Sequence, residues 1–374
     1  MPPSPALVRE LAYEHGFDLV RFGPADPGPD GQRFLAWLEQ GRHGEMRYLE
    51  ENRGRILNPD SWRKGVRSAI ALGVDYGGPR AELNGGGQVA RYAAGRDYHR
   101  WLRDRVFSLR QRLEREGVPH GTCNGGADSV PVLERALAAR SGIGFLAKSA
   151  MVISPTIGPY LQLGELLTGM ELPHDGLAPG SCGTCSACID ACPTSAIVAP
   201  HEVDARRCLS YTTIELRGFA APELRIAQGD RFFGCDVCIE VCPFHKKSPL
   251  LDVHGDARPK DLRPHALLSR WTLVDVLELD ETRYETEWVG TAMRRATRSG
   301  LRRNAAVALG NIGDAKAAPA LTRALVDLDP VVRGHAAWAL GRIGGARAEL
   351  DAARSRETAP EVREEFDRAL SAAR

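Results

Sequence analysis

Cysteine is the residue type whose spacing says most about chemistry in this chain of 374 residues. The chain has nine cysteines, and eight of them fall between residues 182 and 242. The first run reads Cys-x2-Cys-x2-Cys-x3-Cys-Pro and extends from Cys182 to Pro193. In bacterial ferredoxins this run places three thiolates on one 4Fe–4S cluster and the fourth on a second cluster. The sequence therefore predicts an iron–sulfur protein.

A second run repeats the end of the first. It reads Cys-x2-Cys-x3-Cys-Pro from Cys235 to Pro243, and Cys208 stands alone between the two runs. Cys208 therefore takes the place of the missing first thiolate, and the ferredoxin rule then uses each of the eight cysteines once. One cluster is assigned to Cys182, Cys185, Cys188 and Cys242, and the other to Cys192, Cys208, Cys235 and Cys238.

Zinc is the alternative metal, because structural zinc sites also take four cysteines. Zinc ribbons need neither the third closely spaced cysteine nor the Cys-Pro endings, so two iron–sulfur clusters are favoured. Such clusters transfer single electrons and do not perform bond chemistry unaided. The chain therefore needs another redox centre or a docking partner. The ninth cysteine, Cys123, is expected to be a small buried apolar residue.

The sequence offers few candidates for a second redox centre, since it contains neither a dinucleotide-binding glycine motif nor a P-loop. Asp97-Tyr98-His99 begins like the Asp-x-His-x-x-Gly loop in which histidine ligates cobalt, but Leu102 replaces the glycine. His99 is therefore expected in the first turn of a helix. Asp128 could be the N-cap of a following helix, or Ser129 could cap it and leave Asp128 facing a cavity.

The elements that must position these residues alternate between helix and strand. Ser4 is expected to cap a helix over 5–15, and a stripe containing Leu102 and Val106 marks a long helix over 97–116. The other predicted elements are a helix that follows Asp30, a helix over 130–141 ended by Gly142, and strands over 19–22, 68–74, 151–153 and 160–163. A loop rich in glycine and proline over 173–180 marks a domain edge.

A repeat marks the C-terminal part of the chain. The segment 301–314 recurs 31 residues later at 332–345, and Val362 begins a weaker third copy. Pro319 and Pro330 interrupt the stretch between the two copies, so each unit is predicted to be a helix pair of the HEAT or armadillo type. The predicted division is 1–175 for the catalytic domain, 176–250 for the cysteine domain, 251–290 for a connecting segment and 291–374 for the repeats.

Composition excludes several classes of protein. Apolar residues make up 43% and charged residues 26%, as in ordinary globular proteins, and the formal charge is only +1. A nucleic-acid partner must therefore be bound by a local patch rather than by a global field. The sequence contains neither a membrane-spanning run nor a signal peptide, so we expect a cytoplasmic protein whose cysteines bind metal.

Several motifs occur in a fixed order from the first helix to about residue 345. They are Arg91-Tyr92 with Gly95-Arg96-Asp97-Tyr98-His99, Asp128, Gly142-Ile143-Gly144-Phe145 with Lys148, Leu163-Gly164-Glu165, the two cysteine runs, Asp204-Ala205-x-Arg207-Cys208-x-Ser210-Tyr211, Arg303-Asn304-Ala305 and Arg333-Gly334-x-Ala336-Ala337-Trp338-Ala339. With this ordered set the chain resembles the cobalamin-dependent epoxyqueuosine reductases of tRNA modification.

The resemblance implies an α+β fold. A nitroreductase-like domain would hold cobalamin with no protein histidine on cobalt (base-off), beside a ferredoxin-like domain with two 4Fe–4S clusters and a helical-repeat tail. The implied reaction reduces the epoxide of epoxyqueuosine in tRNA to queuosine, the last step of queuosine biosynthesis. The implied partners are the anticodon stem-loop of tRNA, with the queuosine precursor at the wobble position, and an external low-potential electron donor such as flavodoxin or ferredoxin.

The resemblance also assigns residues. Asp128 matches the proton donor and a cofactor contact, and Arg217 matches a tRNA contact. The implied corrin contacts are Arg55, Ala90, Lys148, Ser149, Val152, Leu163 and Ser210. The family commonly has arginine where this chain has Ile56, with Arg55 beside it. An aspartate with an ordinary pKa of about 3.9 is ionised at pH 7, so the acid role requires burial that raises the Asp128 pKa.

Arginines gather in the stretch from Trp288 to Gly313, which contains no acidic residue. They are Arg294, Arg295, Arg298, Arg302 and Arg303. A solvated helix face is the alternative, but a tRNA substrate favours phosphate contacts beside the anticodon stem-loop.

Two other functions compete with tRNA modification. A reductive dehalogenase would share cobalamin and two clusters, but those enzymes usually carry an export signal and need no helical repeats. A ferredoxin-like electron carrier would explain the cysteines and leave the first 170 or so residues without a role.

Overall fold

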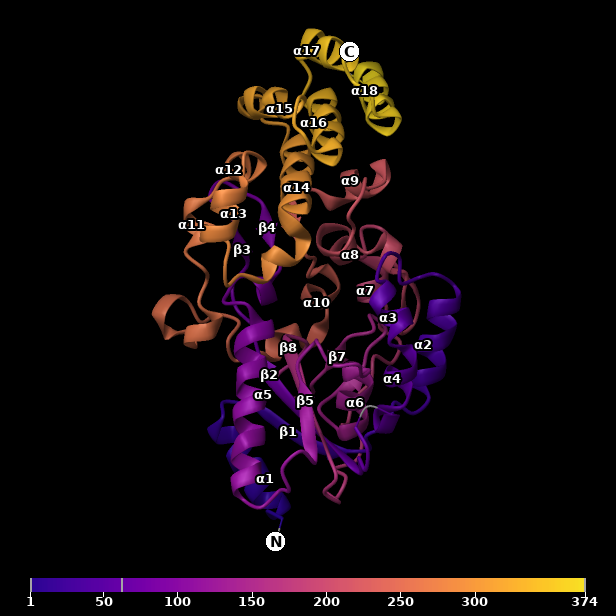
Figure 1. Ribbon diagram of the computed structural model, residues 1–374, viewed down its shortest axis with the longest axis vertical. Helices are drawn as coiled ribbons and strands as arrows, with labels where there is room; N and C mark the ends of the chain where they lie inside the picture. Colours follow the sequence, from indigo (N-terminus) through magenta and orange to yellow (C-terminus); the bar gives the residue numbers. More distant parts are fainter. Residues whose placement is uncertain (1, 62, 373–374) are drawn as a thin grey trace. The chain divides into compact units, whose positions relative to one another are not determined.

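The computed structural model describes residues 2–61 and 63–372, and the chain forms two compact units. Unit 1 comprises Met1–Pro79, Asp97–Ala205 and Asp236–Leu262. Unit 2 comprises Arg80–Arg96, Arg206–Cys235 and Arg263–Arg374. Each unit is thus built from three separate segments, whose colours can be followed along the chain in Figure 1.

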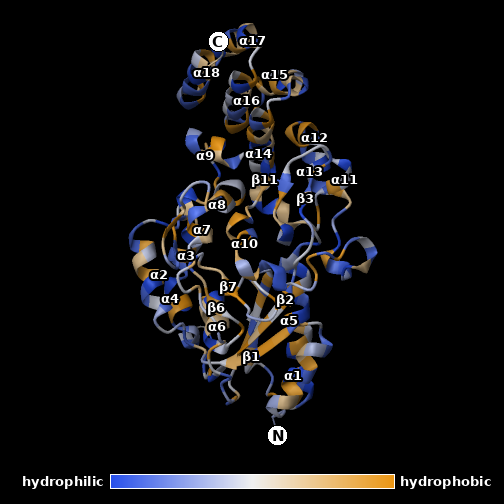
Figure 2. Ribbon diagram, turned by 180° about the vertical axis from the view of Figure 1, so that it is seen from behind, coloured by the Kyte–Doolittle hydropathy of each residue, from blue (hydrophilic) through white to orange (hydrophobic). Residues whose placement is uncertain are grey.

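A four-stranded antiparallel sheet with the strand order β1-β2-β8-β5 forms the centre of unit 1. Its strands are β1 (Leu19–Gly23), β2 (Ser68–Asp75), β5 (Cys123–Gly126) and β8 (Leu161–Thr168). Every residue of β2 is buried, and Figure 2 shows hydrophobic colouring along the strands of this sheet. The sheet therefore supplies much of the apolar core of the unit.

Helices cover both faces of this sheet (Figure 1). α5 (Tyr98–Arg115) packs on β5 and β8, and α6 (Glu134–Ser141) packs on β1, β2 and β8. Val106 of α5 lies against Gly164 of β8, whereas Leu137 of α6 packs with Leu167 of the same strand. Positions 164 and 167 point to opposite faces of a strand, so the two helices lie on opposite sides of the sheet.

Local signals predicted the first helix and the long helix well. α1 (Pro5–Glu14) begins with proline, and the Leu7 N–H donates to the Ser4 hydroxyl oxygen at 3.2 Å. At the start of α5, the His99 N–H donates to Asp97 at 3.1 Å, so Asp97 is the N-cap and His99 lies in the first turn as predicted. Cys123 is buried in β5, which confirms its predicted apolar role.

Two predicted boundaries are wrong. α6 begins at Glu134 rather than at residue 130, because a residue that precedes proline avoids helical geometry and Val130 precedes Pro131. The helix ends at Gly142 as predicted, with φ of 89°. The strand predicted over 160–163 continues to Thr168. The prediction ended too early because Gly164 and Glu165 interrupt the apolar pattern of the strand.

The cysteine-containing part of unit 1 has short elements. α7 lies within the first cysteine run and α10 within the second, and the two helices pack on each other. The remaining elements of unit 1 are α2 (Asp30–Glu39), α3 (Arg47–Glu51), α4 (Arg53–Leu57), β6 (Phe145–Leu146), β7 (Val152–Ile153), α7 (Ala187–Asp190), β9 (Ile197–Ala199), β10 (Glu202–Val203) and α10 (Val237–Glu240).

Unit 2 combines a small sheet with helices. The sheet has the order β11-β4-β3, formed by β3 (Ala81–Glu82), β4 (Gln88–Val89) and β11 (Arg231–Phe233). The helices are α8 (Leu209–Ile214), α9 (Pro222–Gln228), α11 (Leu267–Arg270), α12 (Leu273–Leu277), α13 (Glu281–Glu287), α14 (Thr297–Ile312), α15 (Ala318–Ala324), α16 (Pro330–Ile343), α17 (Arg347–Arg354) and α18 (Pro360–Ala372).

The sequence repeat corresponds to three stacked helices, since α14 packs on α16 and α16 on α18. Gly310 of α14 lies against Ala339 of α16, and Gly341 of α16 lies against Ala369 of α18. A side chain at either glycine would meet the neighbouring backbone, so glycine permits the close approach at both interfaces. The predicted helical repeat is confirmed. None of the helices in residues 2–61 and 63–372 has the length and apolar character of a membrane span.

Candidate active site and cluster ligands

Asp128 lies in the loop that joins β5 to α6. Its φ of 59° is in the left-handed region, which a residue other than glycine adopts only when its surroundings hold it there. The N-cap position of α6 belongs to Leu133, with no side-chain hydrogen bond at that cap. The interpretation of Asp128 or Ser129 as the cap of this helix is therefore wrong, and the Asp128 side chain faces α5 instead.

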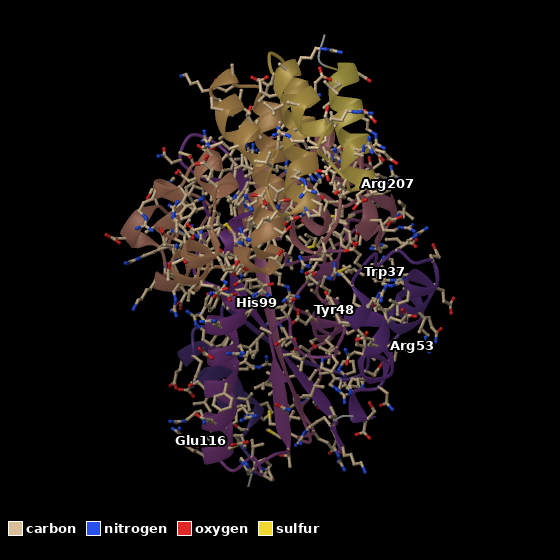
Figure 3. All side chains as sticks on the ribbon, turned by 45° about the horizontal axis from the view of Figure 1, so that its top comes forward. Trp37, Tyr48, Arg53, His99, Glu116 and Arg207 are labelled. Atoms are coloured by element: carbon tan, nitrogen blue, oxygen red, sulfur yellow. The ribbon has the colours of Figure 1, made fainter. Side chains whose placement is uncertain are left out.

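His99 lies in the first turn of α5, where Figure 3 labels its side chain. It bridges two carboxylates. Its Nδ1 lies 2.7 Å from Asp97 Oδ1, and its Nε2 lies 2.8 Å from Asp128 Oδ2. Burial acts to lower the His99 pKa, but the hydrogen bonds and charges of Asp128 and Asp97 outweigh it and raise that pKa to about 9. Both ring nitrogens therefore donate, and at neutral pH the ring is an imidazolium with Asp128 as its ion-pair partner.

Two glutamates lie behind Asp128. The Asp128 backbone N–H donates to Glu134 Oε1 at 2.5 Å, and the Glu134 carboxyl is hydrogen-bonded to that of Glu165 on β8. Burial and the nearby Asp128 raise the Glu134 pKa to about 7, and burial together with Glu134 raises the Glu165 pKa well above its ordinary value. Sequence reasoning assigned neither glutamate a role. The available signal was an acidic residue inside an otherwise apolar strand.

The thiols assigned to the first cluster lie together in unit 1. Burial raises the pKa of the Cys188 thiol, and the charge of neighbouring thiols raises it further. Those neighbours are Cys182, Cys185 and Cys242. The pKa of Cys242 is raised by burial and by Cys182 and Cys185 in the same way. Four mutually repelling thiols from distant parts of the sequence fit the ligand set of one 4Fe–4S cluster.

The other four cysteines are divided between the units, with Cys192 and Cys238 in unit 1 and Cys208 and Cys235 in unit 2. Burial acts to raise the pKa of Cys192, but backbone N–H groups that point at its sulfur outweigh burial and lower it. One of them is the Ala196 N–H, 3.2 Å from the sulfur. Cys192 is therefore stabilised as the thiolate that metal binding requires.

Some of the expected corrin contacts lie close together in unit 1. Val152 and Leu163 belong to one apolar cluster, and Ser149 is buried nearby in the chain between β6 and β7. The Lys148 ammonium donates to the Gly183 and Cys185 carbonyl oxygens, at 2.9 Å each, so it rests on the cysteine loop.

The remaining expected corrin contacts are dispersed. Arg55 is exposed on α4, whereas Ile56, which occupies the position where the family has arginine, is buried. Ala90 and Ser210 lie in unit 2.

The arginines expected to bind tRNA fall into two groups. Arg294, Arg295 and Arg298 are partly exposed, with ion pairs to Glu285 at 2.7 Å, Glu215 at 3.3 Å and Glu281 at 2.8 Å respectively. Their acidic partners come from outside the arginine-rich stretch, where the sequence alone could not locate them. Arg217 donates to the Arg295 carbonyl oxygen at 3.1 Å, so these two predicted contacts lie side by side.

Arg302 and Arg303 require a correction. Both are buried, and their donors are used inside unit 2. Arg302 is paired with Asp327 and donates to the Leu277 carbonyl oxygen at 2.8 Å. Arg303 donates to the backbone carbonyl oxygens of Thr212, Leu216 and Gly218. Neither guanidinium is presented to solvent, so neither is available for a phosphate.

Comparison with known proteins gives three family matches. A family model described as "Epoxyqueuosine reductase QueG, DUF1730" matches residues 57–129. A model of a 4Fe–4S double cluster binding domain matches residues 181–245, and a model of HEAT repeats matches residues 286–371. The chain thus carries an iron–sulfur binding domain and a repeat module in the order that the sequence predicts.

Curated relatives and solved structures agree with these matches. The epoxyqueuosine reductase of Xanthomonas campestris is 36% identical over 91% of this chain and 96% of its own length, and that of Escherichia coli K12 is 33% identical over 90% and 88%. A crystal structure of an epoxyqueuosine reductase with an epoxyqueuosine-modified tRNA-Tyr stem loop superimposes with a TM-score of 0.87, at 28% identity and 98% coverage of both chains. The chain belongs to the epoxyqueuosine reductase family of oxidoreductases.

Proposed function

We propose that this protein reduces the epoxide of epoxyqueuosine in tRNA to the alkene of queuosine. The reaction takes up two electrons and two protons and releases the epoxide oxygen as water. The observation that carries the proposal is the Asp128–His99 ion pair of unit 1, because it places a carboxyl group beside a stored proton. Membership of the family, and a relative solved with the modified stem loop, supply the substrate class.

Asp128 is proposed to protonate the leaving oxygen, since an unprotonated alkoxide leaves poorly. Its side chain is 38% exposed, so the protein alone does not provide the burial that the sequence argument requires. Substrate that covers the loop would exclude water and weaken the charged form of the pair. The Nε2 proton of His99, 2.8 Å away, would then pass to Asp128 and leave a neutral histidine hydrogen-bonded to Asp97.

Cobalamin and two 4Fe–4S clusters are the proposed cofactors, and bound cobalamin would supply low-potential electrons to the epoxide. Both His99 nitrogens face carboxylates, which supports base-off binding without this histidine on cobalt. Val152 and Leu163 offer apolar contacts to the corrin in a nitroreductase-like arrangement of unit 1. The other proposed corrin contacts are Arg55, Ala90, Asp128, Lys148, Ser149 and Ser210.

The thiol chemistry fits the proposed clusters. The first would be held by Cys182, Cys185, Cys188 and Cys242, which are near enough for the charges of some to raise the pKa of Cys188 and of Cys242. By the ferredoxin rule the second would be held by Cys192, Cys208, Cys235 and Cys238. An external donor such as flavodoxin or ferredoxin would reload them in the cytoplasm.

The proposed tRNA surface is now smaller than the sequence suggested. It consists of Arg217, Arg294, Arg295 and Arg298 of unit 2, which are partly exposed. The existing ion pairs with glutamates would be exchanged for phosphates on binding, and backbone phosphates make such binding strongly salt-dependent.

Conversion of a defined substrate tests the proposal. Protein loaded anaerobically with cobalamin, iron and sulfide is mixed with a chemical reductant and an epoxyqueuosine-containing stem loop, and the nucleosides are separated by liquid chromatography and mass spectrometry. We expect the modified nucleoside to lose one oxygen atom. No conversion by protein that holds a corrinoid and about eight irons, the content of two 4Fe–4S clusters, would contradict the proposal.

A further inference from the structure

The Asp128 loop is held partly by hydrogen bonds within itself and partly by Val132, which packs against the buried Ala69, Leu137 and Leu167. Within the loop, the Ser129 N–H donates to the Ala127 carbonyl oxygen at 2.7 Å and the Val132 N–H to that of Val130 at 2.8 Å. These bonds join residues two apart and tie the loop only to itself. Asp128 also holds a left-handed φ of 59°, which is unfavourable for an aspartate outside a restraining environment.

Two of the contacts of Asp128 matter for the position of the loop in unit 1. One is the side-chain contact to His99, and the other is the backbone N–H bond to Glu134 at the first position of α6. The His99 contact must loosen once Asp128 has given its proton to the substrate, because the Asp128 carboxylate and the unprotonated Nε2 of His99 then face each other as two acceptors. The Glu134 contact uses the backbone, so it can hold the loop throughout the reaction.

We propose that Glu134 and Glu165 form an acid pair that shares one proton, and that this pair keeps the Asp128 loop in its catalytic conformation. Glu134 is then a positioning residue for Asp128 and Glu165 is the proton carrier of the pair. The inference rests on the proposed role of Asp128, and it concerns a site to which no function was assigned by the sequence.

The surroundings of the pair explain why a proton must be shared. Glu165 lies between Ala71 of β2 and Gly126 of β5 in the sheet, and neither neighbour offers a charge. Its Oε1 is buried with no hydrogen-bond partner among the described residues, and its contact with Glu134 disfavours a charge on the Glu165 carboxyl. Two carboxyls in contact at a buried site do not both ionise.

Other charges also face the pair, and Asp128 disfavours a charge on Glu165 as well as on Glu134. Asp128 repels a carboxylate at Glu134, and Arg135 attracts it. Arg135 uses part of its guanidinium on the Ala150 carbonyl oxygen, at 2.7 Å. With the proton on Glu165, Glu134 is a single carboxylate that accepts from both Glu165 and the Asp128 N–H. Loss of that proton would leave two buried carboxylates, Glu134 and Glu165, near the carboxylate of Asp128. Their repulsion favours release of the loop.

The pKa of Glu165 is raised well above its ordinary value, so this loss lies on the alkaline side of the Glu134 pKa of about 7. Hydrogen–deuterium exchange of the peptide that spans 127–133 tests the inference on protein without cofactors or tRNA. After correction for intrinsic exchange, protection of the wild-type loop should fall as the pH rises above the Glu134 pKa of about 7 and Glu165 loses its proton. Glu165→Gln, whose amide donates at every pH, should keep the loop protected and abolish this pH dependence.

Removal of the anchor gives the complementary result. Glu134→Ala should speed exchange of the loop about tenfold, as expected for one lost charge-assisted hydrogen bond. Glu10→Ala, which removes an exposed carboxylate on α1, is the matched control and should leave exchange unchanged. Protection of β2 in each variant shows whether the sheet remains folded.

Two results would overturn the inference. One is wild-type protection that does not change with pH, a measurement that needs no variant. The other is a Glu134→Ala protein with native exchange over 127–133. Exchange is measured without turnover, so the acid pair and the proposed reaction are tested separately. If the wild-type enzyme converts the modified tRNA stem loop but Glu134→Ala leaves exchange of residues 127–133 unchanged, the proposed function stands and the positioning role of Glu134 is wrong.

Discussion

Replacement of Asp128 by asparagine tests the ion pair that stores the proton. The perturbation removes one charge and leaves a side chain of the same size that can still accept a hydrogen bond from His99. Asp128 and Asp97 together raise the His99 pKa from its ordinary value of 6.5 to about 9. At about 1.4 kcal/mol per unit of pKa, this net rise favours the imidazolium by about 3.5 kcal/mol.

Asp128 and Asp97 contact His99 at 2.8 and 2.7 Å respectively, so both contribute to this energy. Because Asp128 is 38% exposed, solvent screening reduces its share to about 1 kcal/mol. Asp128→Asn should therefore lower the His99 pKa by somewhat less than one unit. The folded-state pKa of His99 is higher than its ordinary value. The ion pair therefore stabilises the wild-type protein fully below about pH 6.5, and this stabilisation disappears as the pH rises through about 9.

Nuclear magnetic resonance of protein labelled at histidine rings measures this pKa directly. The chain has ten histidines, and the signal of His99 is assigned by its absence from a His99→Gln protein. Asp97→Asn should lower the pKa by a comparable amount, whereas Glu134→Gln should change it little. An Asp128→Asn protein in which His99 still titrates at about 9, with native stability at pH 6, would refute the ion-pair reasoning.

Three further predictions concern the clusters, the tRNA surface and the buried Arg303. Cys208→Ala should degrade only the second cluster and leave about half the iron, and retention of about eight irons per chain would contradict the assigned ligand sets. Replacement of Arg294, Arg295 and Arg298 together by glutamine should weaken tRNA binding and flatten its salt dependence by about 0.7–0.9 in the log–log slope per lost phosphate contact, with iron and corrin content unchanged. Arg303→Ala should lower the free energy of unfolding by about 3 kcal/mol in a denaturant titration, because it leaves buried carbonyl oxygens without donors. An Arg303→Ala protein with native stability would show that these buried bonds contribute little.

Much of the fold follows from local signals that the sequence carries openly. Ser4 and Asp97 cap their helices as predicted, and the three stacked helices follow the repeat. These features depend on residues a few positions apart, so periodicity and capping rules find them. The start of α6 was missed because Pro131 displaced it by one turn, an effect that the apolar pattern alone does not show.

The site was harder to predict, because its parts meet only in the folded chain. Asp128 was a candidate, but its partner His99 is 29 residues away on another element, and the pairing depends on how α5 and the loop cross the sheet. Glu165 was hidden within an apolar strand. Arg303 was assigned to the surface, but it is buried. The sequence of an arginine-rich segment does not show which of its side chains are buried.

The measurement that tests the central claim most directly is a single-turnover comparison of the wild type with Asp128→Asn on an epoxyqueuosine-containing stem loop. Both proteins are loaded with the same corrinoid and iron, saturated with stem loop and reduced in advance, so that only the chemical step is observed. Wild type should convert the modified nucleoside to queuosine, and Asp128→Asn should do so at least about 100-fold more slowly with unchanged stem-loop affinity, the scale expected for loss of a general acid. Equal rates in the two proteins would contradict the role of Asp128.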